Sequence, residues 1–363
     1  MLKYIFAVLV SLPILLLTLC YIAPSVHPES SRILTLLAYL YPYILLLSLL
    51  ALGVVVLSTK WKLAALHILI FVLGWNLHTR YYAFGSAIEN TEAQFKIMSY
   101  NVRSFDLYEH QGFGENIFRD SIMNFLELQQ PDILCLQEFF YENRPKQFMT
   151  IQRIKEKTGL NHHAGAYSIG TNKLTYFGCI ILSSFPIVNK GIVDLEVRTT
   201  NHCVFADIQM DTSLIRVYNF HIGSISFSKE DYVLYDEFNM EISEDEKSKA
   251  LSLIYRFLIA SRTRAQQLAL ILEHAENSPH PVILCGDLND TPTSYAYNEI
   301  TNGYDDAFTK VGSGFGKTYV GKMPSNRIDY IFYDKHFQAL DFMLQKEILS
   351  DHRAIEVQMR IRK

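Results

Sequence analysis

Cysteine is scarce in this chain, and its spacing argues against two kinds of structural site. The 363 residues contain five cysteines, each in an apolar run and none in a CxxC pair: Cys20, Cys135, Cys179, Cys203 and Cys285. A disulfide framework and a structural zinc site both need cysteines at closer, repeated spacing. We therefore expect buried free thiols that act as small hydrophobic residues.

An excess of positive charge is also missing. Lysine and arginine together number 33 against 37 acidic residues, so the formal net charge is −4, and no long basic block occurs. The chain thus lacks the electrostatic footprint of a protein that binds a nucleic-acid duplex tightly. No internal repeat or low-complexity tract is evident in it.

Charge is nearly absent from the first 80 residues, where long apolar runs take its place. Residues 4–23 and 33–57 carry no charge, and residues 63–77 form a shorter third run. A bilayer core of about 30 Å requires roughly 20 apolar residues in a helix. We predict a membrane anchor over residues 1–80, with three transmembrane helices at about 4–23, 33–57 and 63–78. A signal peptide is the alternative for the first run, but an h-region has only about 7–15 apolar residues.

The few charges of the anchor predict its orientation. Lys3 precedes the first run, and Lys60 and Lys62 lie between the second and third. Because positive loops stay in the cytoplasm, the N-terminus and the Lys60 loop are expected there. With three spans, everything after residue 80 lies outside the cytoplasm, on an integral protein of the inner or plasma membrane. If the third segment lies only in the interface, the same domain falls inside.

After a linker at residues 81–93, the residue composition over 94–363 is that of a globular domain. This segment is long enough to bury a full core. Short apolar runs alternate there with helical stretches, which predicts an α/β sandwich of two sheets flanked by helices. The acidic stretch 228–247 is interpreted as a solvent-exposed insertion. The expected strands are 95–100, 133–137, 179–183, 204–210, 214–220, 282–285, 328–333 and 354–359, and the expected helices 116–128, 146–158, one within 247–275, and a short one from 294.

Polar side chains cluster where these strands end. In VILCGDLNDTPTS, residues 282–294, an apolar run stops at Gly286 and presents Asp287 and Asn289 on one side of an extended segment. Taken singly, such residues are turns, caps or satisfied core histidines. Six endings rich in Asp, Glu, Asn and His are hard to explain that way; the other five carry Asn101, Glu138, Asn219 with His221, Asp329, and Asp351 with His352.

Phosphoester hydrolysis is the chemistry that this set fits. Carboxylate and amide oxygens are hard ligands that suit Mg²⁺ or Mn²⁺. A divalent ion orients the phosphate, neutralises developing charge and helps activate water. Amide and imidazolium groups hold phosphate oxygens without repulsion, and a histidine bonded to an aspartate acts as a base or a proton donor.

The order of these motifs resembles a known superfamily. The motif order is that of the endonuclease/exonuclease/phosphatase (DNase I-like) phosphoesterases: N, QE, NxH, GDxN, ID and SDH. The segments YFGCIILSSFPI and RIDYIF also resemble segments of that superfamily. The resemblance covers about residues 94–363 and is to a membrane-anchored, bacterial-type member. It implies a four-layer α/β/β/α sandwich, preceded here by transmembrane helices, with the site where the two sheets meet.

The resemblance also implies a metal site. Glu138 matches the principal metal-ligand glutamate, Asn101 the asparagine that helps arrange metal and phosphate, and Asp351 a further metal-site carboxylate. The implied cofactor is Mg²⁺ or Mn²⁺. Whether one or two ions act stays open.

Five further residues match the family's catalytic positions. Asp287 matches the aspartate that orients or deprotonates the attacking water, and Asn289 the asparagine that binds phosphate. His221 matches a phosphate contact or acid, and Asp329 matches the partner of His352. Which of these groups is the base stays open.

Three more residues are candidates for substrate binding, each with an alternative. Arg264 could reach a phosphate or be a solvated helix-face arginine, and Tyr176 contacts substrate or packs in the core. Thr318 ends the loop GSGFGKT, which lacks Walker A spacing, and could line the cleft.

The sequence leaves the substrate class open. A phosphodiester or phosphomonoester is expected, on a lipid head group beside the bilayer or on another extracytoplasmic compound. A surface nuclease acting on DNA or RNA is the alternative, weakened by the missing basic stripe. A non-catalytic membrane scaffold disagrees with the complete motif set. No protein partner can be inferred.

Overall fold

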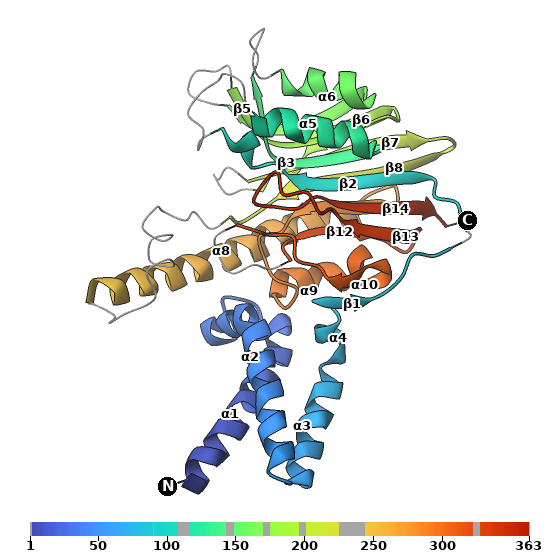
Figure 1. Cartoon of the computed structure of the whole chain (residues 1–363). Coiled ribbons are helices and arrows are strands. Elements are labelled where there is room, and N and C mark those ends of the chain that lie inside the picture. Colours follow the sequence, from blue (N-terminus) through green and yellow to red (C-terminus); the bar gives the residue numbers. More distant parts are fainter. Residues whose placement is uncertain are drawn as a thin grey trace.

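A computed structural model describes residues 2–89, 91–107, 117–142, 149–169, 175–195, 201–224, 244–321 and 327–362. A stalk of apolar helices lies beneath a globular domain of two stacked sheets (Figure 1). The domain sits on one end of the stalk, and the N-terminus lies at the other.

The stalk contains α1 (Leu2–Ile22), the short helix η1 (Ala23–Ser25), α2 (Arg32–Leu57), α3 (Trp61–Leu73) and α4 (Trp75–His78). Two of these helices, covering Phe6–Ser25 and Arg32–Leu57, are long and apolar enough to cross a membrane. At 1.5 Å per residue, the 26 residues of α2 extend about 39 Å. The third predicted span is shorter: α3 has 13 residues and ends at Gly74.

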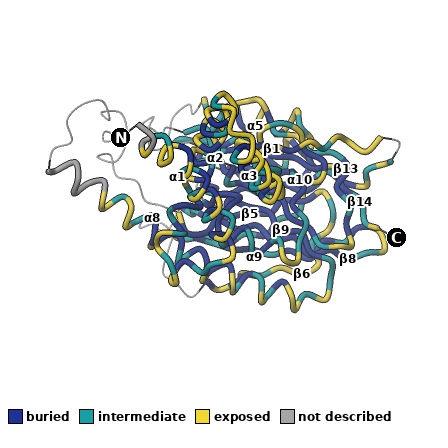
Figure 2. The backbone as a smooth tube through the Cα atoms, turned by 90° about the horizontal axis from the view of Figure 1, so that it is seen from below, coloured by how far each residue is buried: buried dark blue, intermediate teal, exposed yellow. Residues whose placement is uncertain are grey.

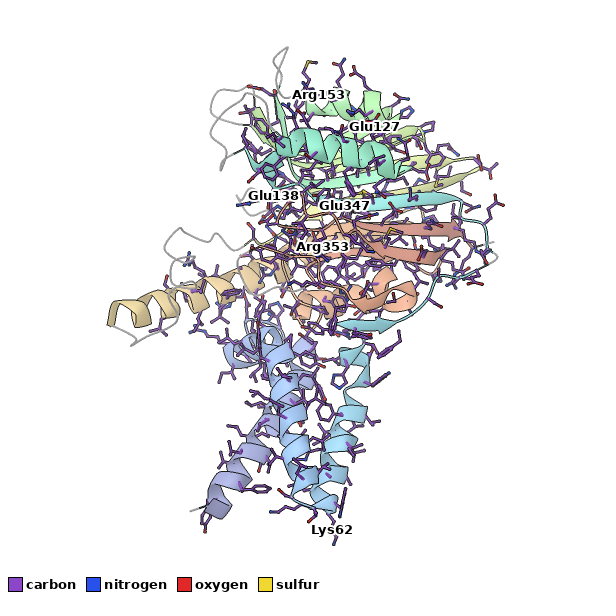
Figure 3. The ribbon with its side chains drawn as sticks, viewed as in Figure 1. Lys62, Glu127, Glu138, Arg153, Glu347 and Arg353 are labelled. Carbon is purple, nitrogen blue, oxygen red and sulfur yellow. The ribbon has the colours of Figure 1, made fainter. Side chains whose placement is uncertain are left out.

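The start of α1 and the turn between α2 and α3 lie at the same end of the stalk. Lys60 Nζ lies 4.0 Å from the ring centroid of Phe6, so the turn between α2 and α3 packs against the start of α1. Lys62 lies at the same end, far from the globular domain (Figure 3). Both lysines of this turn are therefore at the end of the stalk that is remote from the two sheets.

Two six-stranded sheets form the centre of the globular domain, in the orders β13-β14-β2-β3-β5-β4 and β10-β12-β9-β8-β7-β6, and β1 pairs with β11 in a third, small sheet. The strand bounds are β1 Tyr82–Phe84, β2 Phe95–Asn101, β3 Ile133–Glu142, β4 His162–Ile169, β5 Thr175–Ser183, β6 Ile187–Ile192, β7 His202–Met210, β8 Ser213–His221, β9 Val282–Asp287, β10 Asp305–Asp306, β11 Ser313–Phe315, β12 Asp329–Tyr333, β13 Phe337–Leu344 and β14 Ile355–Ile361.

Three apolar layers hold the sheets and helices together. The largest lies between the two sheets and includes Ile97, Cys135 and Ile283. Helices α5 (Ile117–Gln129) and α6 (Thr150–Thr158) cover the outer face of the sheet that holds β2 and β3. Helices α8 (Glu244–Glu276) and α9 (Tyr295–Thr301) cover the other sheet, and α10 (Ala307–Val311) packs near its β10 edge. Buried residues are concentrated in the sheets (Figure 2). The predicted four-layer α/β/β/α sandwich is confirmed.

The structure differs from the expected elements in a few places. Strands β4, β6 and β13 were not expected, and the linker at residues 81–93 contains β1, which pairs with β11. The helix α8 begins at Glu244, so the end of the acidic stretch 228–247 is helical, while residues 228–243 lie outside the described residues. All five cysteines are free and buried, as expected.

Candidate active site

The sheet register gathers the predicted strand ends at one edge of the sandwich. Parallel pairing of β2 with β3 places Asn101 beside Gln137, and parallel pairing of β8 with β9 places His221 beside Asp287. Antiparallel β12 enters next to β9, with Asp329 opposite Asp287. Parallel strands end at the same edge, so side chains far apart in sequence converge between the sheets. Glu138 lies at this edge, where the two sheets meet (Figure 3).

Two carboxylates face each other at the centre of the cluster. The Asn101 Nδ2 amide donates to Glu138 Oε1 at 3.1 Å and to Asp287 Oδ2 at 3.0 Å. His221 Nε2 lies 3.6 Å from Glu138 Oε1 and 3.7 Å from Asp287 Oδ2. This nitrogen is buried and has no hydrogen-bond partner. A buried polar atom without a partner, aimed between two carboxylates, is typical of a site that receives a ligand.

A hydrogen-bonded pair, His352 and Asp329, lies at the buried side of the cluster. His352 Nδ1 lies 2.9 Å from Asp329 Oδ2, and His352 Nε2 lies 3.8 Å from Asp287 Oδ2. Burial alone would lower the pKa of His352, but the carboxylates of Asp329 and Asp287 raise it to about 10. Burial and the neighbouring Asp329 raise the pKa of Asp287 to about 6. The imidazole therefore carries a proton at neutral pH, and the pKa of the facing Asp287 carboxyl lies nearer to neutrality than usual.

Backbone conformation aims two of the cluster's side chains. Glu138 has φ 47°, and the β3–β5 register shifts between Leu136 and Phe139, which marks a β-bulge. Asn289, two residues after the end of β9, has φ 53°. Positive φ is uncommon for non-glycine residues, and it persists where the surrounding structure imposes it, often at functional sites. The bulge in β3 explains why the Glu138 side chain is turned toward the cluster.

The cluster opens to solvent on one side. The side chains of Asp287 and Asp329 are 1% exposed, whereas those of Glu138 and Asp351 are 36% and 24% exposed. Arg103 Nε lies 3.5 Å from Asp351 Oδ2. A pocket of about 440 Å³ lies beside Asp351. Its lining combines Arg103, Asp106, Ser350 and Asp351 with apolar residues such as Phe118 and Leu349. The pocket therefore presents the Arg103 guanidinium together with the carboxylates of Asp106 and Asp351 to a ligand.

The donor set fits a divalent cation. Asp287, Asp329 and His352 each offer a ligand atom within 4.8 Å of the others. However, His352 Nδ1 is already bonded to Asp329, and its raised pKa makes it a poor ligand because metal binding needs the neutral imidazole. Oxygen donors are the ligands that hard divalent ions prefer, and the accessible ones here are the carboxylates of Glu138 and Asp351.

Asn101 and Asn289 both make hydrogen bonds that orient the carboxylates of the cluster. The Asn101 Oδ1 atom accepts from Arg103 N at 3.0 Å, so the amide nitrogen faces the carboxylates and donates to them. The metal-site role of Asn101 stays a prediction. Asn289 Nδ2 donates to Ile222 O at 3.1 Å, and its backbone N donates to Asp287 Oδ1 at 2.8 Å. Asn289 thus lies beside the cluster and fixes the Asp287 carboxylate through its backbone.

The three predicted substrate-binding residues lie at different places. Thr318 is fully buried, and its hydroxyl accepts from the backbone N atoms of Ile328 and Asp329, so it positions Asp329 from behind. The ring of Tyr176 packs against those of Tyr141 and Tyr167, which favours the packing alternative. Arg264 is not solvent-exposed: it is fully buried and paired with Asp290, so the solvated alternative is wrong.

Sequence reasoning gave no role to several residues that support the cluster. Asn219 bridges the sheets, because its amide donates to Leu136 O and Ile180 O in the opposite sheet. Gln137 Nε2 donates to Asn219 Oδ1 at 2.7 Å, and Ser350 Oγ donates to Asn101 O at 2.9 Å. Gln137 and Asn219 belong to the QE and NxH motifs. Their position in the motifs, next to Glu138 and near His221, is the sequence feature that could have indicated their supporting role.

Comparison with known sequences and structures agrees with this geometry. Residues 98–352 match the Endonuclease/Exonuclease/phosphatase family, and residues 3–81 match a domain of unknown function (DUF8431). No curated protein sequence matches the chain.

Solved structures share the fold at low identity. A functionally unknown conserved protein from Enterococcus faecalis V583 is 16% identical, with a TM-score of 0.53 over 74% of this chain and 100% of that chain. The mannosyl-6-phosphatase Bt3783 of Bacteroides thetaiotaomicron VPI-5482 is 18% identical, with a TM-score of 0.50 over 74% and 100%. TDP2 of D. rerio, complexed with single strand DNA product, is 17% identical, with a TM-score of 0.51 over 73% and 98%. At such identities the likeness shows the fold alone.

The family match spans most of the chain and includes every strand end of the cluster, from β2 to the residues before β14. The protein therefore belongs to the endonuclease/exonuclease/phosphatase family and is a hydrolase of phosphoester bonds.

Proposed function

We propose that the protein is a membrane-anchored, divalent-metal-dependent phosphoesterase whose catalytic domain lies outside the cytoplasm and cleaves a phosphodiester or phosphomonoester with water. One observation carries the proposal. Carboxylate, amide and imidazole groups from separate strand ends converge within hydrogen-bond distance or slightly beyond, in an opening between the two sheets. Such a set holds a cation and a phosphate at the same time.

Glu138 and Asp351 are the residues that would hold the cation, and their oxygen donors suit Mg²⁺ or Mn²⁺. When bound, such an ion neutralises charge on the phosphate and lowers the pKa of water. Asn101 holds Glu138 and Asp287 in one orientation by donating to both carboxylates. Arg103 lies beside Asp351 and offers a positive charge where the pocket opens.

Asp287 orients the attacking water and accepts its proton. Its carboxyl has a pKa of about 6, raised first by burial, and a base whose pKa lies near the working pH transfers protons efficiently. His352 stays protonated through Asp329 and donates to a phosphate oxygen as negative charge develops. His221 and Asn289 supply further polar contacts to the phosphate from β8 and the β9 loop.

For the substrate, we favour a phosphoester at the membrane surface, such as a lipid head group. The stalk helices contact the globular domain directly, and the site belongs to that domain, so the site stays close to the bilayer. The net charge of −4 and the absence of a long basic block disfavour tight binding to nucleic acid.

The full chain, purified in detergent, tests the proposal against phospholipids, inositol phosphates, chromogenic phosphate mono- and diesters, RNA and plasmid DNA, each with Mg²⁺, Mn²⁺ or EDTA. We expect metal-dependent hydrolysis that EDTA abolishes, with a phospholipid or lipid-like ester turned over fastest. Preferred cleavage of RNA or DNA would support the nuclease alternative. Folded protein that cleaves none of these with metal present would refute the enzyme assignment.

A further inference from the structure

The polar loop that follows β9 is buried against the stalk. Asp290, Thr291, Thr293 and Ser294 are each at most 3% exposed, although loops of polar residues usually face solvent. Thr293 Oγ1 donates to Ala38 O of α2 at 2.7 Å, and the Tyr81 hydroxyl lies 2.7 Å from Thr293 Oγ1. The stalk therefore covers a segment that begins one residue after Asn289.

Arg264 of α8 connects two catalytic strand ends to α2. Its Nε lies 3.1 Å from Asp290 Oδ2, and its Nη1 donates to Gly223 O at 2.9 Å. Its Nη2 donates to the hydroxyl of Tyr39 in the stalk. Gly223 lies two residues after His221, and Asp290 follows Asn289 directly. One buried guanidinium thus joins the ends of β8 and β9 to the membrane helix.

A second arginine makes a similar connection at β12. Arg327 is 2% exposed, pairs with Asp306 at 2.6 Å and donates to Arg80 O at 2.8 Å. Arg80 in turn donates to Pro292 O at 3.1 Å. Arg327 precedes Asp329 by two residues, so a third catalytic strand end is fixed to the junction between α4 and β1.

These contacts join the catalytic loops and the stalk in one continuous buried network. A buried ion pair retains its geometry only while its remaining donors are satisfied, and Tyr39 supplies the acceptor for one Arg264 nitrogen. If the stalk shifts, water reaches Asp290 and Arg264. The positive φ of Asn289 then loses the surroundings that impose it.

We propose that the membrane stalk is a positioning element of the active site, with Tyr39 and Thr293 as positioning residues that set the conformation of the loops carrying His221, Asp287 and Asn289. The inference rests on the proposed function for its kinetic consequence. A change in the bilayer or in the packing of α2 would then alter the geometry of the catalytic side chains and change kcat.

Two pairs of variants in the full chain test this. Tyr39→Phe removes the acceptor of Arg264 but keeps the ring, and Tyr43→Phe makes the same change at an exposed position of α2. Thr293→Val removes the hydroxyl that bonds Ala38, whereas Thr293→Ser keeps a hydroxyl. With bis(p-nitrophenyl) phosphate and Mn²⁺, we expect Tyr39→Phe and Thr293→Val to lower kcat about tenfold, equivalent to about 1.4 kcal/mol, with KM changed less than about twofold. Tyr43→Phe and Thr293→Ser should stay close to wild type.

Hydrogen exchange gives a readout that needs no turnover. The amides of Asn289 and Gly223 bond Asp287 Oδ1 and Gln267 Oε1, so peptides covering 219–224 and 286–294 should exchange slowly in wild type. We expect about tenfold faster exchange in these peptides in Tyr39→Phe and Thr293→Val, and no change elsewhere in the β-sheets. Wild-type exchange and wild-type kcat in both variants would overturn the inference. If wild type hydrolyses nothing, the proposed function fails, while the exchange data still decide the coupling.

Discussion

Glu138 combines three properties that single out a ligand: it lies at a bulge in a buried strand, it has positive φ, and it is the most exposed of the central carboxylates. We predict that Glu138→Gln, which keeps the shape and removes the charge, lowers kcat at least about 100-fold, or about 3 kcal/mol of transition-state stabilisation. The measurement is metal-dependent hydrolysis with the full chain, together with the apparent Tm.

Glu127→Gln on α5 is the matched control, because it removes the same charge from an exposed side chain that pairs only with surface groups. It should hydrolyse at the wild-type rate. Retained activity in Glu138→Gln with the metal still required would show that the ligand lies elsewhere in the cluster.

Thr318 acts on the site through the backbone. Its hydroxyl is the acceptor for the N–H groups of Ile328 and Asp329, and leaving buried donors without a partner costs about 1–3 kcal/mol. We predict that Thr318→Val lowers both the apparent Tm and kcat, because Asp329 no longer meets His352 in the same geometry. Thr318→Ser should restore most of both quantities. Equal kcat for the two variants would refute a positioning role.

At the scale of elements, Gly286 determines how closely β8 and β9 approach. It has φ 152°, and a Cβ atom there would lie 2.0 Å from Phe220 O. We predict that Gly286→Ala destabilises the domain by about 3 kcal/mol and displaces the adjacent Asp287, so that both Tm and kcat fall. In Gly303→Ala, the control, the added Cβ meets nothing within 4 Å, and thermal unfolding should be unchanged.

Several elements could be predicted from the sequence because their pattern is local. The apolar runs of β2, β3 and β9 and their polar ends are continuous in the chain, and so is the Ser294 cap of α9. Strand β4 was missed because its sequence HHAGAYSI mixes polar and small residues. The bulge at Glu138 follows from pairing with β5, which no local pattern specifies.

Arg264 marks the limit of sequence reasoning on the site. Its partner Tyr39 is 225 residues away, in the stalk, and its other partners come from two separate loops. A charged residue on a helix is interpreted as solvated unless those partners are known. Burial of this arginine is a property of the assembled chain and not of its own helix.

At the scale of the whole molecule, the direction of the stalk decides which compartment holds the site. Lys62 and the N-terminus lie at the end remote from the sheets (Figures 1 and 3), and Lys60 packs on Phe6 at that same end. Under the proposed membrane anchoring, the positive charge of this turn favours the cytoplasmic side for this end. The proposed orientation then puts the globular domain on the other side of the membrane, with α3 crossing by itself or together with α4.

We therefore predict that a reporter enzyme active only after export, fused after Lys363, is active, and that a reporter active only in the cytoplasm is not. Reversing the charge of the turn with Lys60→Glu and Lys62→Glu should lower the exported fraction, because the turn loses the residues that retain it. Lys335→Glu with Lys346→Glu changes the same charge on the exposed surface of the globular domain and should leave the fraction unchanged. Activity of the cytoplasmic reporter alone would place the catalytic domain inside, and the substrate would then be sought among cytoplasmic phosphoesters.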